Sequence, residues 1–539
     1  MKINRHRLIS GLLAATLLVG AAVANAPTAP ALAAGTASTD QPAAVTPTAS
    51  ASVTYATSGW LHTRKGEIKT ASNRSYVIKA TSWFGMETAT CAPHGLWTIS
   101  LDEGLAQIKS MGFNTIRLPF SNECIRSTSL TSGSNVNFTK NPSLEGTTPL
   151  EVMDIVVARA KVYGINIILD RHRPSSSAQS ELWYTAGYSE AKWISDWKKL
   201  AKRYKSDSTV IGFDLHNEPH GKACWGCGKK STDWRLAAMR AGNAVLKVNS
   251  RLLIIVEGVD KQSSTSYTWW GGALAAVAKK PVRLSVAHRV VYSPHDYPAS
   301  VYRQSWFTAK NYPNNLTTMW KKNWGYIAQK GIAPVLLGEF GTKLETKSDR
   351  QWLAKLVGYL KKTKISFAYW SFNPNSGDTG GLVKDDWVTP QSKKLTALKP
   401  IIGSGRVVPV IPADPTDPTD PVPTPTPTPT PTPSPSGTPT PAVSAAWSIG
   451  SSWAAGYVAN IDVSSVSGAS SWTISWSDSK LTRVVNSWGM TCTYRAKKSV
   501  TCTGSDFGIP VAAGATVRPG LVIEASRVLT APKFTITAK

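Results

Sequence analysis

Eight short apolar segments, separated by amphipathic ones, constrain the fold of this 539-residue chain most strongly. They lie at residues 76–84, 115–119, 165–170, 210–215, 252–257, 290–294, 334–340 and 365–372. Several, such as 165–169 and 252–256, are apolar throughout rather than alternating, which is typical of parallel strands buried on both faces. Helical patterns at 101–111, 191–204 and 233–248 lie between them. The repeats predict an α/β fold, a (β/α)8 TIM barrel.

Polar and aromatic side chains follow most of these segments, at the point where each predicted strand ends. They are Arg117, Asp170, His172, Asn217, Glu218, His295, Tyr297, Glu339 and Trp370. The carboxyl ends of barrel strands meet at one mouth, where the chemistry of such barrels takes place. We therefore expect these residues to converge on a single site.

Two of them, Glu218 and Glu339, are glutamates on different strands. Hydrolysis of a glycosidic bond needs such a pair, with one carboxyl protonated to assist the leaving oxygen and one ionised. The sequence has no phosphate-cradling glycine loop, no metal-ligand cluster and no Gly-x-Ser-x-Gly before a helix. We expect a glycoside hydrolase without a metal or other cofactor.

Specific segments carry a family resemblance. Residues 212–219 (GFDLHNEP), 295–297 (HDY) and 337–341 (LGEFG) resemble the signature segments of glycoside hydrolase family 5. Further matches run from residues 60–62 to residues 385–387, so the similarity covers the large domain. Within the family, the chain is most similar to secreted actinobacterial endo-β-1,4-glucanases.

The resemblance implies a role for each site residue. Glu218 would be the general acid and base and Glu339 the nucleophile, with retention of anomeric configuration. The other implied contacts are Arg117 and Tyr297 to the nucleophile, Asn217 to the sugar 2-hydroxyl, His172 and His295 to the polar floor, and Trp370 under the sugar. Physically, Arg117 would favour ionised Glu339, and a second carboxylate about 5 Å away would raise the pKa of Glu218.

Four more tryptophans follow strands and are candidates for sugar platforms, because the apolar face of a β-linked glucose lies flat on an indole. They are Trp183, Trp225, Trp269 and Trp270. Ordinary packing is an equal alternative for Trp183 and Trp225. The pair Trp269 and Trp270 is the better candidate, and we assign Trp270 to substrate binding.

Residues 442–539 have no helical period and read as short alternating strands, which predicts a small all-β sandwich. Segments around Trp453 and Trp488 resemble the family 2 cellulose-binding modules. The resemblance implies a binding strip of Trp453, Trp488 and Phe507, with phenylalanine where a third tryptophan is usual. Trp472 and Trp476 share one face of a strand and are expected in the core. Crystalline cellulose is the expected ligand, and chitin or another insoluble glycan stays open.

The ends and the middle of the chain divide it into parts. A basic start and an apolar run predict a signal peptide at residues 1–33, followed by a disordered leader at 34–54. The catalytic domain would span 55–410 and the binding module 442–539. Between them, residues 411–441 form a Pro/Thr-rich linker that cannot bury a face. The predicted protein is secreted, with no membrane contact after signal cleavage.

Six cysteines in an exported chain favour disulfides. Linear order pairs Cys91 with Cys124, Cys224 with Cys227, and Cys492 with Cys502. For Cys224 and Cys227, half of a zinc site or a redox pair is the alternative, although no second ligand pair lies nearby.

The formal net charge is +27, and +23 of it lies in residues 55–410. Cellulose is neutral, so this charge has no part in the expected chemistry. Nucleic-acid binding is disfavoured by the export signal and by the lack of a basic stripe with base-stacking residues. The expected protein is a monomeric cellulase acting on β-1,4-glucan. The alternatives are a β-mannanase or xyloglucanase of the same family, and a non-catalytic wall-binding protein.

Overall fold

The structure is a computed structural model that describes residues 55–263, 266–411, 443–453, 456–505, 509–517, 519–530 and 532–538. The predicted signal peptide and leader, and the linker after Ile411, lie outside these residues. Among the described residues, no helix is both long and apolar enough to cross a bilayer.

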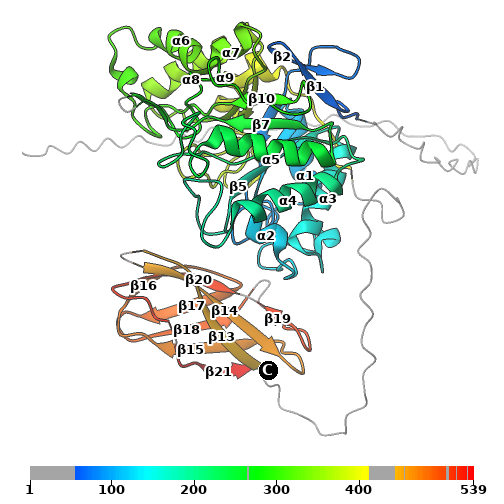
Figure 1. The fold of residues 1–539 in the computed structure, drawn as a ribbon. Helices are drawn as coiled ribbons and strands as arrows, with labels where there is room; N and C mark the ends of the chain where they lie inside the picture. The colour runs from blue at the N-terminus through cyan, green and yellow to red at the C-terminus, as the bar shows by residue number, and fades with distance from the viewer. Residues whose placement is uncertain are drawn as a thin grey trace, which may run out of the picture. The chain divides into compact units, whose positions relative to one another are not determined.

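A parallel eight-stranded sheet forms the centre of the first folded part (Figure 1). Its strands lie in the order β10-β7-β6-β5-β4-β3-β12-β11. Parallel bridges Tyr292–Val335 and His295–Glu339 join the two edge strands, so the sheet closes into a barrel. The strand bounds are β3 (Lys79–Ser82), β4 (Thr115–Ser121), β5 (Asn166–Arg173), β6 (Val210–Asp214), β7 (Leu253–Glu257), β10 (Val290–Ser293), β11 (Leu336–Phe340) and β12 (Ser366–Tyr369). All eight predicted strands are confirmed.

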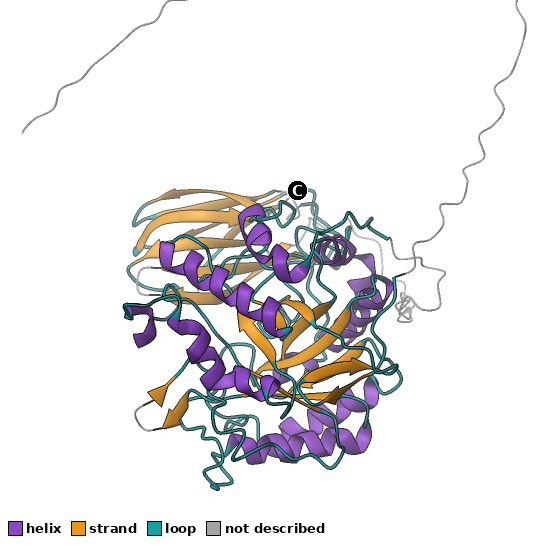
Figure 2. Cartoon of the chain, turned by 90° about the horizontal axis from the view of Figure 1, so that it is seen from above, coloured by secondary structure: helices purple, strands orange, loops and turns teal. Residues whose placement is uncertain are grey.

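Helices surround the strands on the outside (Figure 2). They are α1 (Leu101–Ser110), α2 (Asn122–Arg126), α3 (Pro149–Val162), α4 (Glu190–Arg203), α5 (Trp234–Val248), α6 (Asn315–Trp320), α7 (Tyr326–Gln329), α8 (Lys347–Thr363) and α9 (Ser392–Ile402). Shorter helical turns are η1 (Pro142–Leu144), η2 (Ser305–Thr308) and the π-helical turn η3 (Lys321–Gly325). The three helices predicted from the sequence are α1, α4 and α5, and each begins and ends within one residue of its predicted bounds.

The sheet is buried on both faces, which explains its continuously apolar strands. In β7, Leu253 and Ile255 belong to the cluster inside the barrel, whereas Ile254 and Val256 pack outward against the helices. The sequence did not predict the hairpin of β1 (Leu61–Arg64) and β2 (Glu67–Thr70). This hairpin adds Leu61 and Ile68 to the interior cluster.

The same alternation brings polar side chains inward at the carboxyl ends of the strands. Glu257 follows Leu253 and Ile255 in the inward-pointing set of β7. In β4, Arg117 lies between the outward-packed Ile116 and Leu118. Along these strands, the inward-facing side chains therefore change from apolar to charged within two residues.

The second folded part consists of antiparallel strands, as predicted. One sheet has the order β13-β14-β20-β16 with β19 paired to β14, and the other has the order β17-β18-β15-β21. The bounds are β13 (Val443–Trp453), β14 (Gly456–Ser465), β15 (Trp472–Ser477), β16 (Leu481–Trp488), β17 (Met490–Arg495), β18 (Ser499–Gly504), β19 (Thr516–Val517), β20 (Gly520–Ala525) and β21 (Thr535–Ala538). Trp472 and Trp476 are buried in its core, which confirms that prediction.

All three predicted disulfides are present: Cys91–Cys124, Cys224–Cys227 and Cys492–Cys502. Because Cys224 and Cys227 are joined in a disulfide, the zinc alternative for this pair is not supported. The Cys91–Cys124 bridge ties the loop after β3 to α2.

Candidate active site

A cleft of about 830 Å³ opens at the carboxyl ends of the barrel strands. Glu218 and Glu339 both line it, together with His172, Tyr297 and Trp370. These residues therefore lie together at one site, as the sequence predicts. Their elements are far apart in the sequence and meet only because the barrel closes.

Arg117 is the charged centre beneath the cleft, and it is fully buried. Its guanidinium lies 2.7 Å from Glu339 Oε1, 3.1 Å from Asp170 Oδ2 and 3.0 Å from Asp214 Oδ2. It also donates to Asn217 Oδ1 at 2.9 Å and to Glu257 Oε1 at 3.1 Å. Asp170, Asp214 and Glu257 lie close enough to share a cation. The cation that they share is this guanidinium.

Glu339 lies near the end of β11, where the strand pairing with β12 is irregular. The register shifts between Leu337 and Phe340, which inserts one extra residue on the β11 side. Such a bulge re-aims side chains next to it. Glu339 receives hydrogen bonds from Arg117 and from the Tyr297 hydroxyl, which lies 2.7 Å from Oε2. Both expected contacts to this residue are present.

Glu218 follows β6 in a left-handed backbone conformation, with φ of 53°. Non-glycine residues hold this conformation only where their surroundings enforce it. The backbone N–H of Glu218 donates to Glu257 Oε2 at 2.7 Å. At the side chain, Gln179 Nε2 donates to Oε2 at 3.4 Å.

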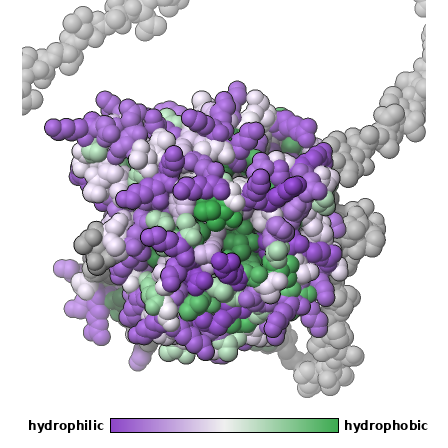
Figure 3. All heavy atoms as spheres, turned by 45° about the horizontal axis from the view of Figure 1, so that its top comes forward, coloured by the Kyte–Doolittle hydropathy of each residue, from purple (hydrophilic) through white to green (hydrophobic). Residues whose placement is uncertain are grey.

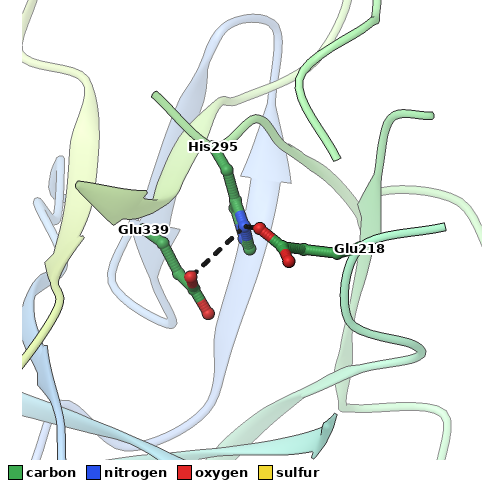
Figure 4. Close-up of side chains that lie close together, drawn as sticks. All are labelled: Glu218, His295 and Glu339. Atoms are coloured by element: carbon green, nitrogen blue, oxygen red, sulfur yellow. Dashed lines mark hydrogen bonds and ion pairs between the residues drawn. The ribbon is translucent and has the colours of Figure 1, made fainter. Parts of the chain in front are cut away.

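His295 lies between the two glutamates (Figure 4). Its Nδ1 is 2.9 Å from Glu218 Oε1 and 3.5 Å from Glu339 Oε2. One carboxylate oxygen of Glu218 lies within 4.8 Å of one of Glu339. Carboxyl pairs separated by about 5 Å are typical of retaining glycosidases, whereas inverting enzymes need a wider gap for water.

The expected direction of the Glu218 pKa is wrong for this structure. Burial raises the pKa of Glu218, but the hydrogen bond and the charge of His295 outweigh burial and hold the pKa below its ordinary value. For His295, burial lowers the pKa, yet Glu257, Glu339 and Glu218 raise it well above its usual range. His295 Nδ1 and Glu218 Oε1 therefore share one proton in a hydrogen bond of 2.9 Å.

His172 lines the cleft, and Asn217 directly precedes Glu218 in the chain. Asn217 Nδ2 is buried and has no hydrogen-bond partner among the described residues, so its amide donor is unsatisfied there. His172 Nδ1 lies 2.7 Å from Asp170 Oδ2. Burial lowers the pKa of His172 to about 4, so its ring is neutral near neutral pH.

The aromatic residues divide into platforms and packing. Trp370 lines the cleft and stacks on His172 and Phe84, with ring centroids 5.2 and 5.5 Å apart. Trp270 also lines the cleft, is 45% exposed, and stacks on His220 at 3.7 Å. Both can present an indole face to a sugar ring.

The other three candidates are less exposed. Trp183 is fully buried and donates from Nε1 to Glu190, so packing, one of its two equal alternatives, is its role. Trp225 is half-buried, packs on the helical core and donates to the carbonyl of Lys280. Trp269 borders the cleft but is only 7% exposed.

The sequence reasoning did not single out Asp214 and Glu257, although both bind Arg117. Burial raises the pKa of Asp214 to about 7 and that of Glu257 to about 8, against the opposing charge of Arg117 and His295. The alternation of inward and outward side chains within each strand could have identified them, because a carboxyl in an inward position cannot face solvent.

In the small domain, the backbone of two predicted binding residues is described. Trp453 ends β13 and pairs with Gly456, and Trp488 ends β16 and pairs with Gly520. Their side chains, and all of Phe507, lie outside the described residues. The predicted binding strip therefore stays a prediction.

The barrel, the carboxyl pair and the aromatic cleft define a class, the barrel glycoside hydrolases. The sequence matches the family Cellulase (glycosyl hydrolase family 5) over residues 74–376. The chain belongs to this family, whose members are retaining enzymes. Residues 443–539 match the family Cellulose binding domain.

Similar proteins agree with this assignment. An "Endoglucanase" of Paenibacillus polymyxa is 51% identical over 352 residues, which cover 64% of this chain and 88% of that protein. A "Major extracellular endoglucanase" of Xanthomonas campestris is 39% identical, covering 62% of this chain and 69% of that protein. A complex of the Pyrococcus horikoshii endocellulase with cellotetraose has a TM-score of 0.60 at 38% identity, over 65% of this chain and all of that one.

Proposed function

We propose that the protein is a secreted endo-β-1,4-glucanase that hydrolyses internal bonds of cellulose through Glu339 as nucleophile and Glu218 as acid and base. The observation that carries the proposal is the pair of glutamates within 4.8 Å, bridged by His295 and lying in an open aromatic cleft. The non-catalytic alternative has no use for such an arrangement.

In the first step, Glu339 attacks the anomeric carbon and the glycosidic C–O bond breaks. Arg117 and Tyr297 hold Glu339 from two sides, which fixes its attacking oxygen. The leaving oxygen takes the proton held between His295 Nδ1 and Glu218 Oε1. A covalent glycosyl ester on Glu339 results.

In the second step, water attacks the same carbon and Glu339 is released. Glu218 accepts the proton of that water, and the proton returns to the pair with His295. Two inversions give net retention of configuration. The free Nδ2 of Asn217 is placed to donate to a sugar hydroxyl, and Trp370 to stack on the sugar ring.

Cellulose is favoured as substrate by two independent similarities. The relatives named above are endoglucanases, and one related enzyme is in complex with cellotetraose. The cellulose-binding domain of this chain would bring the barrel to an insoluble glucan. A β-mannanase or xyloglucanase would use the same carboxylates, so reducing-sugar release from carboxymethylcellulose, mannan and xyloglucan separates these functions.

The proposed division of the chain is a signal peptide at 1–33, a leader at 34–54, a catalytic domain at 55–410, a linker at 411–441 and a binding module at 442–539. Trp453, Trp488 and Phe507 would form the binding strip. Retention on microcrystalline cellulose, compared between the natural chain and Trp488→Ala, tests the strip.

Two substitutions test the catalytic roles. Glu339→Gln should lower kcat by at least about 10⁴-fold with an unchanged melting temperature, because no covalent intermediate can form. Glu218→Ala should slow cellotetraose far more than 2,4-dinitrophenyl cellobioside, whose leaving group needs no proton. Near-normal activity of Glu339→Gln, or equal losses of Glu218→Ala on both substrates, would refute the assignment.

A further inference from the structure

Glu257 is a buried carboxyl that the proposed mechanism does not use. It ends β7 and has no exposed surface. Its Oε2 lies 2.6 Å from the point that a side chain on Gly271 would occupy. The loop after β7 thus comes close to this carboxyl, which a larger residue at Gly271 would displace.

Each oxygen of Glu257 contacts a different part of the acid and base machinery. Oε2 accepts the backbone N–H of Glu218 at 2.7 Å, and Oε1 lies 3.3 Å from His295 Nε2. The opposite nitrogen of the same imidazole lies 2.9 Å from Glu218 Oε1. Glu257 therefore contacts the backbone of Glu218 directly. It also contacts the side chain of Glu218 indirectly, through the His295 imidazole, whose two nitrogens face the two carboxyl groups.

We propose that Glu257 is a positioning residue for Glu218: it fixes the backbone of Glu218 and, across His295, holds the proton that Glu218 delivers. The inference rests on the proposed role of Glu218 as acid and base. The contact to the backbone explains why Glu218 keeps a φ of 53°, because its N–H donates to a buried carboxyl oxygen. The contact to Nε2 places a second carboxyl behind the imidazole.

The charge of Glu257 decides how firmly the pair of Glu218 and His295 keeps its proton. Burial raises the pKa of Glu257 to about 8, so it is mostly protonated below that pH and becomes a carboxylate above it. As a carboxylate it stabilises the imidazolium, which then loses its proton only at higher pH. The groups facing this pair are Arg117 of β4, Asp170 and His172 of β5, Asp214 of β6, Tyr297 after β10 and Glu339 of β11.

Two substitutions separate the two contacts. Glu257→Gln is an isostere of the protonated carboxyl and keeps an oxygen to accept the Glu218 N–H, but it cannot ionise. We expect the basic limb of kcat/KM on cellotetraose to move to lower pH by about one unit, and the acidic limb to stay. Glu257→Ala removes the acceptor as well, so kcat should fall about 100-fold on cellotetraose and much less on 2,4-dinitrophenyl cellobioside.

Asp296→Asn is the matched control. Asp296 is also fully buried with a pKa raised to about 8 by burial, but it binds the indoles of Trp320 and Trp352 and has no contact with Glu218. Its basic limb should not move. The inference is overturned if the limb of Glu257→Gln stays in place, or if that of Asp296→Asn moves equally. Glu257→Gln tests the positioning role even if Glu257→Ala does not fold. Loss of activity in Glu339→Gln would support the proposed function whether or not the positioning role of Glu257 holds.

Discussion

Asp296 lies between His295 and Tyr297 in the sequence but serves the outer packing of the barrel. Its two oxygens accept from Trp352 Nε1 at 2.9 Å and from Trp320 Nε1 at 2.8 Å, on helices α8 and α6. Burial raises its pKa to about 8, and the two hydrogen bonds oppose that rise only in part. At this residue, folding is therefore coupled to holding a proton.

The sign of that coupling is testable. The unfolded chain releases the Asp296 proton near pH 4 and the folded chain near pH 8, so this residue lowers stability as pH rises between those values. In Asp296→Asn, the free energy of unfolding should fall less steeply between pH 5 and 7, by up to about 1.4 kcal/mol per pH unit. Chemical unfolding at three pH values measures it, and an identical slope in both proteins would contradict the assignment.

Single residues also mark where sequence reasoning succeeded and where it stopped. Arg117 and Glu339 were predictable because a charged side chain at the carboxyl end of a buried barrel strand is more often part of a functional site than of the core. Glu257 was part of a predicted strand, yet its role depends on two distances, to Glu218 and to His295, that no pattern encodes. The lowered pKa of Glu218 escaped prediction for the same reason, since a histidine and not a second carboxylate is its nearest partner.

At the scale of elements, helix α1 approaches the barrel through a glycine. A side chain on Gly104 would lie 2.2 Å from the indole of Trp83, which is fully buried. Gly358 in α8 offers a comparison, because no described residue outside its own helix places an atom within 4 Å of the same point there. The two glycines share a helical setting and differ in the space beside them.

Alanine at these two positions should have opposite effects. Gly358→Ala gains helix propensity and should stabilise the protein by about 0.5–1 kcal/mol. Gly104→Ala gains the same propensity but overpacks the core against Trp83, and should cost about 1–3 kcal/mol. Melting temperatures of the two variants check the prediction. A stabilised Gly104→Ala would mean that α1 can shift away from the sheet.

Elements that are buried on both faces were the easiest to predict. Strands such as β5 and β7 are apolar on the helix side and on the inner side, so their composition alone marks them. The hairpin β1–β2 has only one buried apolar residue in each strand, Leu61 and Ile68, and this weak signal was missed. The extra residue in β11 was also invisible, because only strand pairing reveals a bulge.

At the scale of the whole molecule, the burial of carboxylates makes the surface of the barrel more positively charged. Carboxylates such as Asp170, Asp214 and Glu257 are buried around Arg117, whereas few lysines are buried. Figure 3 shows a face on which hydrophilic side chains surround a smaller hydrophobic area. The excess of positive charge is therefore carried by solvent-exposed residues, outside the proposed chemistry.

The two folded parts should contribute separately to activity. A chain ending at Ile411 keeps every residue of the cleft, so its kcat/KM on cellotetraose should stay within about twofold of the full chain. On microcrystalline cellulose its rate should fall about tenfold at low substrate, because binding no longer concentrates the enzyme on the surface. Equal rates on the insoluble substrate would show that residues 443–539 do not target the barrel.

The covalent role of Glu339 can be tested by trapping the glycosyl-enzyme intermediate. A 2-deoxy-2-fluoro-β-cellobioside with a good leaving group should form a stable glycosyl-enzyme, because fluorine slows both steps and the good leaving group restores the rate of the first step only. Peptide mass spectrometry should then place one fluorocellobiosyl group on the peptide that contains Glu339. A label on any other residue, or an unlabelled enzyme that keeps turning over the reagent, would contradict the account.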